Sequence, residues 1–454
     1  MQIADQHIVV AGLGQTGRAL VRFLLRRGAR VTVTDSAPAE ELSDALAELA
    51  ELGEAPVETV LGGHDAAVFA SADMIVLSPG VAHTLPSIRQ AAEQGIPVIG
   101  EIELAFRFMK TPIVAITGTN GKSTATLLAG QMLKDSGFRV FVGGNLGTPL
   151  IAYADADDTA DFAVAELSSF QLDTIDQFRP QVAVLLNITA DHLDRYADFE
   201  AYIRSKGRIF ENQTSKDVAV VNLADPATEK LAPGIRAHML PFNAGPSDTA
   251  GAAVGEEHVE FRMPGQPPHI LDCRRIPLIG AHNRENIAAA GLAALAAGAS
   301  FASIRQTAGA FHGLPHRMTP VATIDGVHYI DDSKATNVDA VVRALASFST
   351  PVILIMGGRE KGGSYSALKA LFPGRVKHLV VMGEAARAIE AALGDAAPIS
   401  HATSMAEAVR IAKHHASSGD TVLLSPACAS FDMYESYAQR GDDFVQQVHE
   451  TEAD

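Results

Sequence analysis

Short runs of apolar, often β-branched residues alternate along the chain with longer stretches rich in alanine and leucine. Strands that are buried on both faces read as nearly continuous apolar runs, so this alternation predicts parallel sheets covered by helices on both sides. The runs expected to form strands are residues 8–11, 30–34, 74–77, 113–116, 162–165, 182–186, 218–221, 327–330, 352–356, 378–382 and 421–424. The pattern therefore predicts an α/β protein.

Glycine turns follow three of these strands and precede helical stretches, at residues 12–14, 118–123 and 357–358. Three Rossmann-like units explain them more simply than one large sheet. A chain of 454 residues also exceeds what one hydrophobic core usually supports. We therefore expect three domains, with boundaries near Gly100 and Gly313. Residues 241–268, rich in glycine, proline and alanine, are expected to form a hairpin-bearing excursion from the middle domain.

The charge balance limits the classes of partner. With 36 basic and 53 acidic residues, the formal net charge is -17, which argues against nucleic acid or an anionic membrane as the main partner. Cys273 and Cys428 are the only cysteines, too few for a disulfide framework or a cysteine-rich metal site. The N-terminus lacks signal-peptide features, and no apolar run approaches the ~20 residues that span a bilayer. We therefore expect a cytoplasmic protein.

The strongest candidate chemistry lies in one loop between strand 113–116 and a helix expected at 125–134. Its residues are Gly118, Thr119, Asn120, Gly121, Lys122 and Ser123. Glycines let backbone N–H groups form an anion nest, the helix N-terminus adds partial positive charge, and Lys122 reaches the terminal phosphates. Ser123 is suited to ligate Mg²⁺. Ile116 breaks the strict Walker pattern, but the context favours an ATP loop over an ordinary glycine turn.

The first glycine turn, at residues 12–17, also follows a strand, and Asp35 ends the next strand. This arrangement places a diphosphate at the helix N-terminus. NAD and a UDP-sugar both satisfy that geometry, and a purely structural turn is the plain alternative. We favour UDP or a similar diphosphate.

Two further segments begin where buried strands end. Glu166 follows strand 162–165, and His192 lies in the segment after strand 182–186. Ligands collect at the carboxyl ends of strands in open α/β sheets, and a carboxylate and an imidazole can both bind divalent ions. Either residue alone reads as a surface or capping residue. Their shared placement beside the phosphate loop favours a Mg²⁺ site.

Polar groups also gather in the last third of the chain. His316 and Arg317 lie in a linker containing glycine and proline, and Asp332 follows strand 327–330. An N-cap role explains Asp332 adequately but not the His-Arg pair. The loop 357–363 is glycine-rich and basic, suited to binding a carboxylate or phosphate. Cys428 has no base nearby in sequence, so we interpret it as a small buried residue.

These motifs together resemble the Mur ligase family over essentially the whole chain. The matching segments, in family order, are residues 118–124, 166–171, 191–195, 282–286, 314–317, 332–337 and 424–432. The resemblance implies an N-terminal Rossmann-like UDP-binding domain (1–100), a central P-loop ATPase-like domain with a mostly parallel sheet (101–313) and a C-terminal Rossmann-like glutamate-binding domain (314–454). Thr16 and the segment 425–432 favour the member that adds D-glutamate to UDP-N-acetylmuramoyl-L-alanine.

The resemblance also implies roles for individual residues. The catalytic set is Lys122, His192, Lys206 and Arg317. ATP would contact Gly118, Thr119, Asn120, Gly121, Lys122, Ser123, Thr124, Asn283, Arg317 and Asp332. The UDP substrate would contact Gly14, Gln15, Thr16, Asp35, Ser36 and Asn145. Glutamate would contact Thr336, Lys361, Ser430 and Phe431. Magnesium, expected as two ions, would be held by Ser123, Glu166, His192 and Lys206, the last as a carbamate.

The resemblance further implies a monomer that handles three small molecules, ATP, D-glutamate and UDP-N-acetylmuramoyl-L-alanine, with no nucleic-acid or membrane partner. One departure from the family is Ala37, which stands where some members carry an arginine near the uracil.

Competing interpretations of the function are an NAD-dependent oxidoreductase, a regulatory P-loop protein, a sibling ligase and a folate polyglutamating enzyme. The first leaves the loop at 118–123 unexplained.

Overall fold

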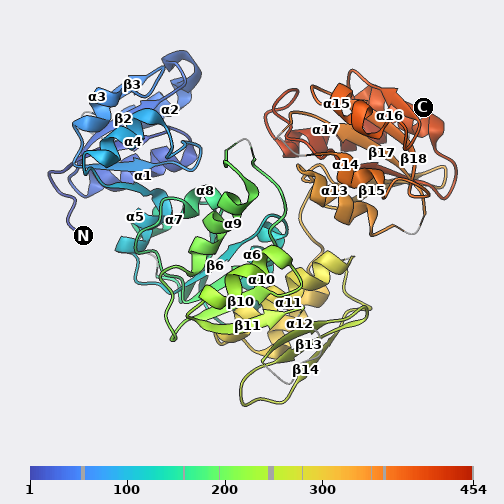
Figure 1. Ribbon diagram of the computed structural model, residues 1–454, viewed down its shortest axis with the longest axis horizontal. Helices are drawn as coiled ribbons and strands as arrows, with labels where there is room; N and C mark the ends of the chain where they lie inside the picture. The colour runs from blue at the N-terminus through green and yellow to red at the C-terminus, as the bar shows by residue number, and fades with distance from the viewer. Residues whose placement is uncertain are drawn as a thin grey trace. The chain divides into compact units, whose positions relative to one another are not determined.

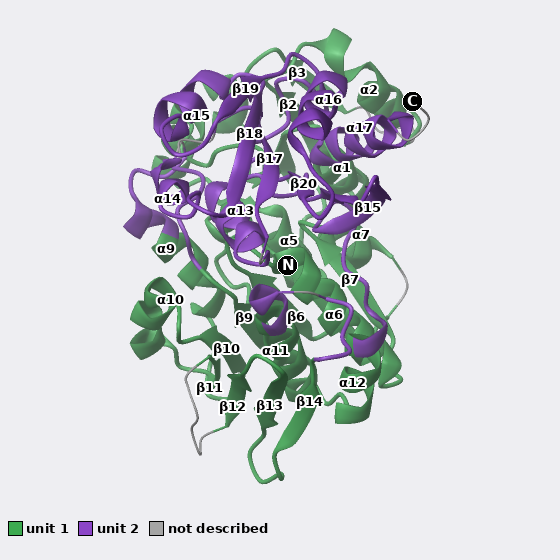
Figure 2. Ribbon diagram, turned by 90° about the vertical axis from the view of Figure 1, so that its right-hand side faces the viewer, with its two compact units in different colours: residues 1–187, 203–273, 285–308 green, residues 188–202, 274–284, 309–454 purple. Residues whose placement is uncertain are grey.

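The computed structural model describes residues 1–52, 57–156, 159–193, 195–243, 250–278, 280–348, 350–360 and 364–451. The chain divides into two compact units (Figure 2). The first comprises residues 1–187, 203–273 and 285–308, and the second comprises residues 188–202, 274–284 and 309–454. Two sheets belong to the first unit and a third sheet to the second, so the predicted α/β fold with three sheets is confirmed.

The N-terminal sheet, in the blue part of the chain in Figure 1, is parallel. Its strand order is β3-β2-β1-β4-β5. Its strands are β1 (His7–Ala11), β2 (Arg30–Asp35), β3 (Glu58–Leu61), β4 (Met74–Leu77) and β5 (Val98–Gly100). Its helices are α1 (Gln15–Arg26), α2 (Ser43–Ala50), α3 (Ala66–Ala70), α4 (Pro86–Glu93) and α5 (Glu101–Phe108). The strand order reverses between β1 and β4, and ligands of open α/β sheets bind in the crevice at such a point.

The central sheet has nine strands in the order β14-β13-β12-β11-β10-β9-β6-β8-β7. They are β6 (Ile113–Thr117), β7 (Val140–Gly144), β8 (Phe162–Glu166), β9 (Val182–Leu185), β10 (Val218–Asn222), β11 (His238–Phe242), β12 (Gly251–Val254), β13 (His258–Arg262) and β14 (His269–Asp272). The helices are α6 (Lys122–Asp135), α7 (Leu150–Asp155), α8 (Ser169–Leu172), α9 (Phe199–Gly207), α10 (Pro226–Leu231), α11 (Ala281–Ala296) and α12 (Phe301–Ala310). Strands β12 to β14 pair antiparallel, which confirms the predicted hairpin-bearing excursion.

The third sheet has six strands in the order β15-β16-β20-β17-β18-β19, and β15 runs antiparallel to its neighbour. They are β15 (Thr319–Ile324), β16 (Val327–Asp331), β17 (Val352–Gly357), β18 (Val376–Met382), β19 (Ile399–His401) and β20 (Thr421–Leu424). The helices are α13 (Val338–Leu345), α14 (Ser366–Lys369), α15 (Ala386–Leu393), α16 (Met405–His415) and α17 (Tyr437–Glu450). Short 3-10 helices of the first unit lie at Ala39–Leu42, Arg208–Phe210 and Ala232–Gly234.

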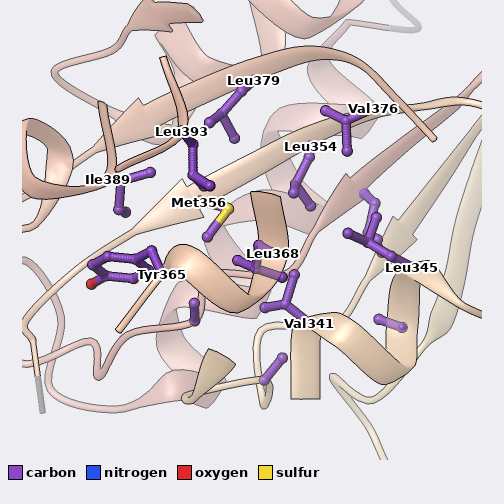
Figure 3. Packing of buried hydrophobic residues seen from close by; sticks show 14 of the residues in the cluster. Val341, Leu345, Leu354, Met356, Tyr365, Leu368, Val376, Leu379, Ile389 and Leu393 are labelled. Atoms are coloured by element: carbon purple, nitrogen blue, oxygen red, sulfur yellow. The ribbon is translucent and has the colours of Figure 1, made fainter. Parts of the chain in front are cut away.

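Both faces of this sheet are covered by apolar side chains. On one face, Leu354 and Met356 of β17 meet Val341 of α13, Leu368 of α14 and Leu393 of α15 (Figure 3). On the other face, a second buried cluster includes side chains of α16 and α17. A strand buried on both faces has no polar alternation, which is why the apolar runs predicted the strands well.

The predicted strands agree with the observed ones within one or two residues at each end, β18 for example beginning at Val376. The helix expected at 125–134 is longer in the structure and spans Lys122–Asp135. Among the described helices, none is long and apolar enough to cross a membrane.

Candidate active site

The phosphate loop joins the buried strand β6 to α6 in the first unit. Gly121 has φ +86°, a left-handed conformation that side chains disfavour, and a Cβ there would collide with Oδ1 of Asn286. The loop is braced by Asn187, which follows β9. Its Oδ1 accepts from the Asn120 N–H at 2.9 Å, and its carbonyl accepts from the Thr119 N–H at 2.8 Å. These two contacts fix the first half of the loop against the segment after β9.

Lys122 is the first residue of α6, and its ammonium folds back over the loop. Nζ donates to the carbonyl oxygens of Gly118 at 3.0 Å and Thr119 at 2.9 Å. The helix N-terminus adds its partial positive charge at the same place. The loop thus combines fixed N–H groups, a helix dipole and one flexible cationic side chain, which suits a polyphosphate.

Glu166 lies beside this loop, because β8 runs parallel to β6 with Glu166 opposite Ile116. The residue is 4% exposed. Its Oε1 accepts from Nδ2 of Asn145 at 2.8 Å, whereas its Oε2 is buried without a hydrogen-bond partner. Buried carboxylate oxygens normally have partners, so this oxygen fits a hard cation such as Mg²⁺.

The other predicted metal ligands divide between the two units. Ser123 and Lys206 lie in the first unit, and the Lys206 ammonium donates to the Gly118 carbonyl at 2.8 Å. His192 lies in the second unit, where its φ is +56° and its N–H donates to Oδ1 of Asp191. Among the described residues, no three His, Cys, Asp or Glu side chains gather as a complete metal site. Hydroxyl and phosphate oxygens would have to complete the coordination.

A cavity of about 610 Å³ lies in the first unit beside the N-terminal glycine turn. All six residues predicted to contact the UDP substrate line it: Gly14, Gln15, Thr16, Asp35, Ser36 and Asn145. The Asp35 carboxylate accepts from the backbone N–H groups of Leu13 at 2.7 Å and Ala37 at 2.9 Å. Each Asp35 oxygen is therefore already engaged in shaping the turn.

In the second unit, the predicted nucleotide residues Arg317 and Asp332 contact each other. Nη1 of Arg317 lies 3.5 Å from Oδ1 of Asp332, and the Ser425 hydroxyl donates to Oδ2 at 2.9 Å. Burial raises the pKa of Asp332 to about 6, although the Arg317 charge and the hydrogen bond from Ser425 act in the opposite direction. Asn283 is also buried in this unit.

Family comparisons identify the protein class. Residues 6–100 match the model of the Mur ligase MurD-like N-terminal domain, residues 116–294 the Mur ligase middle domain, and residues 316–428 the Mur ligase glutamate ligase domain. The chain belongs to the Mur ligase family. It is 53% identical over 448 residues to the UDP-N-acetylmuramoylalanine--D-glutamate ligase of Desulfosudis oleivorans, covering 99% of this chain and 97% of that protein. The enzyme of the same name from Desulfatibacillum aliphaticivorans is 47% identical over 449 residues, 99% of each chain.

Solved Mur ligases and a related ligase share the fold. MurF from Acinetobacter baumannii superimposes with a TM-score of 0.63 at 17% identity, covering 98% of this chain and 91% of that one. The pseudomurein peptide ligase type C from Methanothermus fervidus gives a TM-score of 0.62 at 21% identity, covering 98% and 100%.

Among the described residues predicted to bind glutamate in this Mur ligase, Thr336 lines a cavity and two others do not. Thr336 lines a cavity of about 430 Å³ in the second unit, together with Asp191, Asn337 and Tyr365. Nδ2 of Asn337 donates to the Asp191 carboxylate at 3.1 Å. Two other predicted contacts, Ser430 and Phe431, do not line this cavity; Ser430 is buried, whereas Phe431 is 62% exposed. Lys361 lies outside the described residues.

Arg440 of α17 was not predicted as a site residue of this Mur ligase, yet its side chain holds several segments of the second unit together. The guanidinium is 2% exposed and donates to five acceptors: Ser333 Oγ and Ser333 O, Gly357 O, Cys428 O and Ala429 O. Ser333 lies in the loop after β16, Cys428 and Ala429 lie in the loop after β20, and Gly357 is the last residue of β17. The first two loops carry Thr336 and Ser430. In sequence, Arg440 reads as a polar position of an amphipathic helix, and no local signal marks it as buried.

Cys428 is fully buried in this Mur ligase, and its Sγ lies 3.1 Å from the hydroxyl of Tyr365. Burial raises the pKa of the thiol to about 11. A thiol in that state is a poor nucleophile at neutral pH. These observations agree with the interpretation of Cys428 as a packing residue.

Proposed function

We propose that this Mur ligase joins D-glutamate to UDP-N-acetylmuramoyl-L-alanine in peptidoglycan precursor synthesis, consuming ATP and releasing ADP and phosphate. The observation that carries the proposal is the 53% identity, over 99% of this chain, to a protein named UDP-N-acetylmuramoylalanine--D-glutamate ligase. The cavity lined by all six predicted UDP contacts supports the same substrate. The matches to residues 6–100, 116–294 and 316–428 support domains of 1–100, 101–313 and 314–454. We place the reaction in the cytoplasm, where ATP is available.

The reaction activates a carboxylate. The carboxylate of UDP-N-acetylmuramoyl-L-alanine attacks the γ-phosphorus of ATP, giving an acyl phosphate and ADP. The glutamate amine then attacks the acyl carbon, and the tetrahedral intermediate loses phosphate to leave the amide and a proton. Both nucleophile and electrophile begin as anions, so catalysis depends on positioning and on neutralising charge.

The phosphate loop supplies the first part of that neutralisation. Its glycines and the N-terminus of α6 provide N–H donors, and Lys122 is close enough to exchange its two loop carbonyls for phosphate oxygens. Exchanging neutral carbonyl partners for anionic oxygens strengthens each hydrogen bond. Lys122 would therefore hold the γ-phosphoryl group as negative charge shifts toward the leaving ADP.

Ser123, Glu166 and His192 would hold Mg²⁺, together with a carbamate on Lys206. A bound Mg²⁺ neutralises phosphate charge. The unpaired Oε2 of Glu166 supports this ligand set from the side of the first unit. Lys206 is 1% exposed, and its ammonium would first lose a proton to give the amine, which adds CO₂ and releases a second proton to form the carbamate. This would replace a buried ammonium by oxygens that attract the cation.

In the second unit, Arg317 and Asp332 would bind the nucleotide, and Thr336, Lys361, Ser430 and Phe431 would bind glutamate. The Asp332 carboxylate can accept from ribose hydroxyls once ionised, and Arg317 can neutralise phosphate. Arg440 supports these roles indirectly, because it holds Ser333 and Ala429 in the loops that carry Thr336 and Ser430.

One assay tests the proposal. ADP release is measured with UDP-N-acetylmuramoyl-L-alanine and a panel of amino acids that includes both glutamate enantiomers. We expect turnover with D-glutamate and background rates with L-glutamate, L-alanine and L-lysine. Turnover with another amino acid would assign the chain to a sibling activity. Absence of ADP release with every amino acid would contradict the proposal.

A further inference from the structure

Glu101 is a buried carboxylate outside the residues predicted to bind substrate. It is the first residue of α5 and is 2% exposed. Its Oε1 accepts from the Ile151 N–H at 2.7 Å, and the nearby Leu150 N–H and Gln171 side chain also lower its pKa by favouring the charged form. Burial raises the pKa of Glu101 to about 7, because desolvation disfavours the ionised carboxylate and the neutral donors around it offset only part of that cost.

The donors that converge on Glu101 belong to two walls of the UDP-substrate cavity. Leu150 and Ile151 form the first turn of α7, directly after Pro149, which lines the cavity a few residues beyond Asn145. Gln171, in α8, lines the same cavity. One carboxylate therefore ties together two segments that are separate in sequence and face the same ligand space.

The orientation of Gln171 is fixed by its other contacts. Its Oε1 accepts from the backbone N–H of Ser168 at 2.9 Å and from the Ser168 hydroxyl at 3.0 Å, completing the capping box of α8. Its amide nitrogen is thereby directed away from Ser168, and the Gln171 side chain acts on Glu101 as a donor that favours the ionised carboxylate. All three groups around Glu101 are donors, so a carboxylate, which only accepts, satisfies them. A glutamine in place of Glu101 would turn its own NH₂ donor toward these donors.

We propose that Glu101 is a positioning residue for the UDP substrate, holding the α7 N-terminus and Gln171 at the spacing that the cavity needs. The role rests on the proposed function of that cavity. Glu101 does not line the cavity and acts through the residues it holds. Its loss should weaken binding of the UDP substrate and leave ATP handling unchanged, because the phosphate loop is braced separately by Asn187.

Glu103 provides a matched control two residues along the same helix. It is 0% exposed, and its carboxylate accepts from the backbone N–H groups of Asp176, Gln177 and Phe178 and from Arg107. None of these partners lines the UDP-substrate cavity. The two glutamates therefore share burial and helix, and differ in whether their partners face the substrate.

The test compares the full-length enzymes carrying Glu101→Gln and Glu103→Gln. KM for UDP-N-acetylmuramoyl-L-alanine, KM for ATP, kcat and the melting temperature are measured for each. We expect Glu101→Gln to raise KM for the UDP substrate about tenfold while KM for ATP and kcat stay within about twofold. Glu103→Gln should lower the melting temperature and leave both KM values unchanged.

Two results would overturn the positioning role: an unchanged KM for the UDP substrate in Glu101→Gln, or an equal rise in both KM values. If Glu101→Gln does not fold, Glu101→Asp is measured instead. It keeps the charge but shortens the reach by one methylene, and it should raise KM for the UDP substrate alone. A wild-type enzyme without turnover would contradict the proposed function and this role together. Wild-type turnover with unaffected Glu101 variants would contradict only the role of Glu101.

Discussion

The ammonium of Lys206 donates a 2.8 Å hydrogen bond to the carbonyl oxygen of Gly118, the first residue of the phosphate loop. Lys206 comes from α9 and is 1% exposed. This contact places a buried cation against the loop on which we propose that the anionic end of ATP binds. An unmodified ammonium at this position would attract phosphate but repel Mg²⁺, whereas a carbamate would do the reverse.

Replacing Lys206 distinguishes these two states. We expect Lys206→Ala to lose most turnover and to recover part of it when a short carboxylic acid such as acetate is added, because the free acid can occupy the space of the carbamate. The measurement is the rate of ADP release as a function of acetate concentration. Lys122→Ala serves as the control that acetate should not rescue. Lack of recovery in Lys206→Ala would count against carbamylation.

Removing the loop lysine should abolish turnover without unfolding the protein. Lys122 is partly exposed and its ammonium donates to carbonyls of its own loop, so Lys122→Ala removes a cation whose loss the fold tolerates. We expect a fall in kcat of about 10²- to 10³-fold, typical of losing an electrostatic contact made in the transition state. Steady-state ADP release and a circular dichroism melt measure the two effects. Near-normal turnover would show that the phosphates bind elsewhere.

A single methyl group should disable the phosphate loop. Gly121→Ala forces a side chain into φ +86° and drives its Cβ into Oδ1 of Asn286. The backbone strain alone costs about 1–3 kcal/mol. We expect KM for ATP to rise and the free energy of unfolding to fall. Both are measured beside Gly137→Ala, where φ is +92° but no atom lies within 4 Å of the new Cβ.

Gly137→Ala isolates the strain from the collision, because Gly137 follows the other end of α6. It should lose stability while keeping the wild-type KM for ATP. Equal effects of the two substitutions on KM would mean that the shape of the loop at Gly121 is not important for nucleotide binding.

The strands that the sequence predicted are mostly buried along their length, whereas strands with several exposed positions, such as Glu58–Leu61 and His269–Asp272, were not predicted. Apolar runs such as residues 352–356 fit a parallel strand covered on both faces, and the glycine turns mark where such strands meet helices. The six UDP contacts were predicted by resemblance, and the structure gathers them around one cavity. Local pattern and family motif agree at these positions.

The residues that organise the site from behind could not be predicted. Arg440 and Glu101 are charged residues on helices, a pattern typical of solvated faces, yet both are buried among polar partners distant in sequence. Asn187 likewise braces the phosphate loop from another strand. Their roles depend on tertiary contacts, and the periodicity of a single helix or strand carries no information about those.

Nucleotide affinity should depend on pH through Asp332. Burial raises the pKa of this carboxyl from 3.8 to about 6, so the residue becomes protonated as the pH falls below about 6. A protonated carboxyl loses part of its capacity to accept from ribose hydroxyls. We expect KM for ATP to rise as the pH is lowered from 7 to 5 in the wild-type enzyme. In Asp332→Asn, KM for ATP should be high at every pH, and a parallel rise in the variant would assign the titration to another group.

The same shift predicts how Asp332 affects stability. Its folded-state pKa lies above its unfolded value, so the folded state is favoured when the carboxyl is protonated and loses that advantage as the pH rises from about 4 through 6. The full shift corresponds to about 3 kcal/mol. Asp332→Asn cannot ionise and should escape this loss. We therefore expect the free energy of unfolding of Asp332→Asn, relative to that of the wild-type enzyme, to increase as the pH rises from 4 to 7. A constant difference across that range would mean that Asp332 titrates normally and that the charge of Arg317, 3.5 Å away, compensates for its burial.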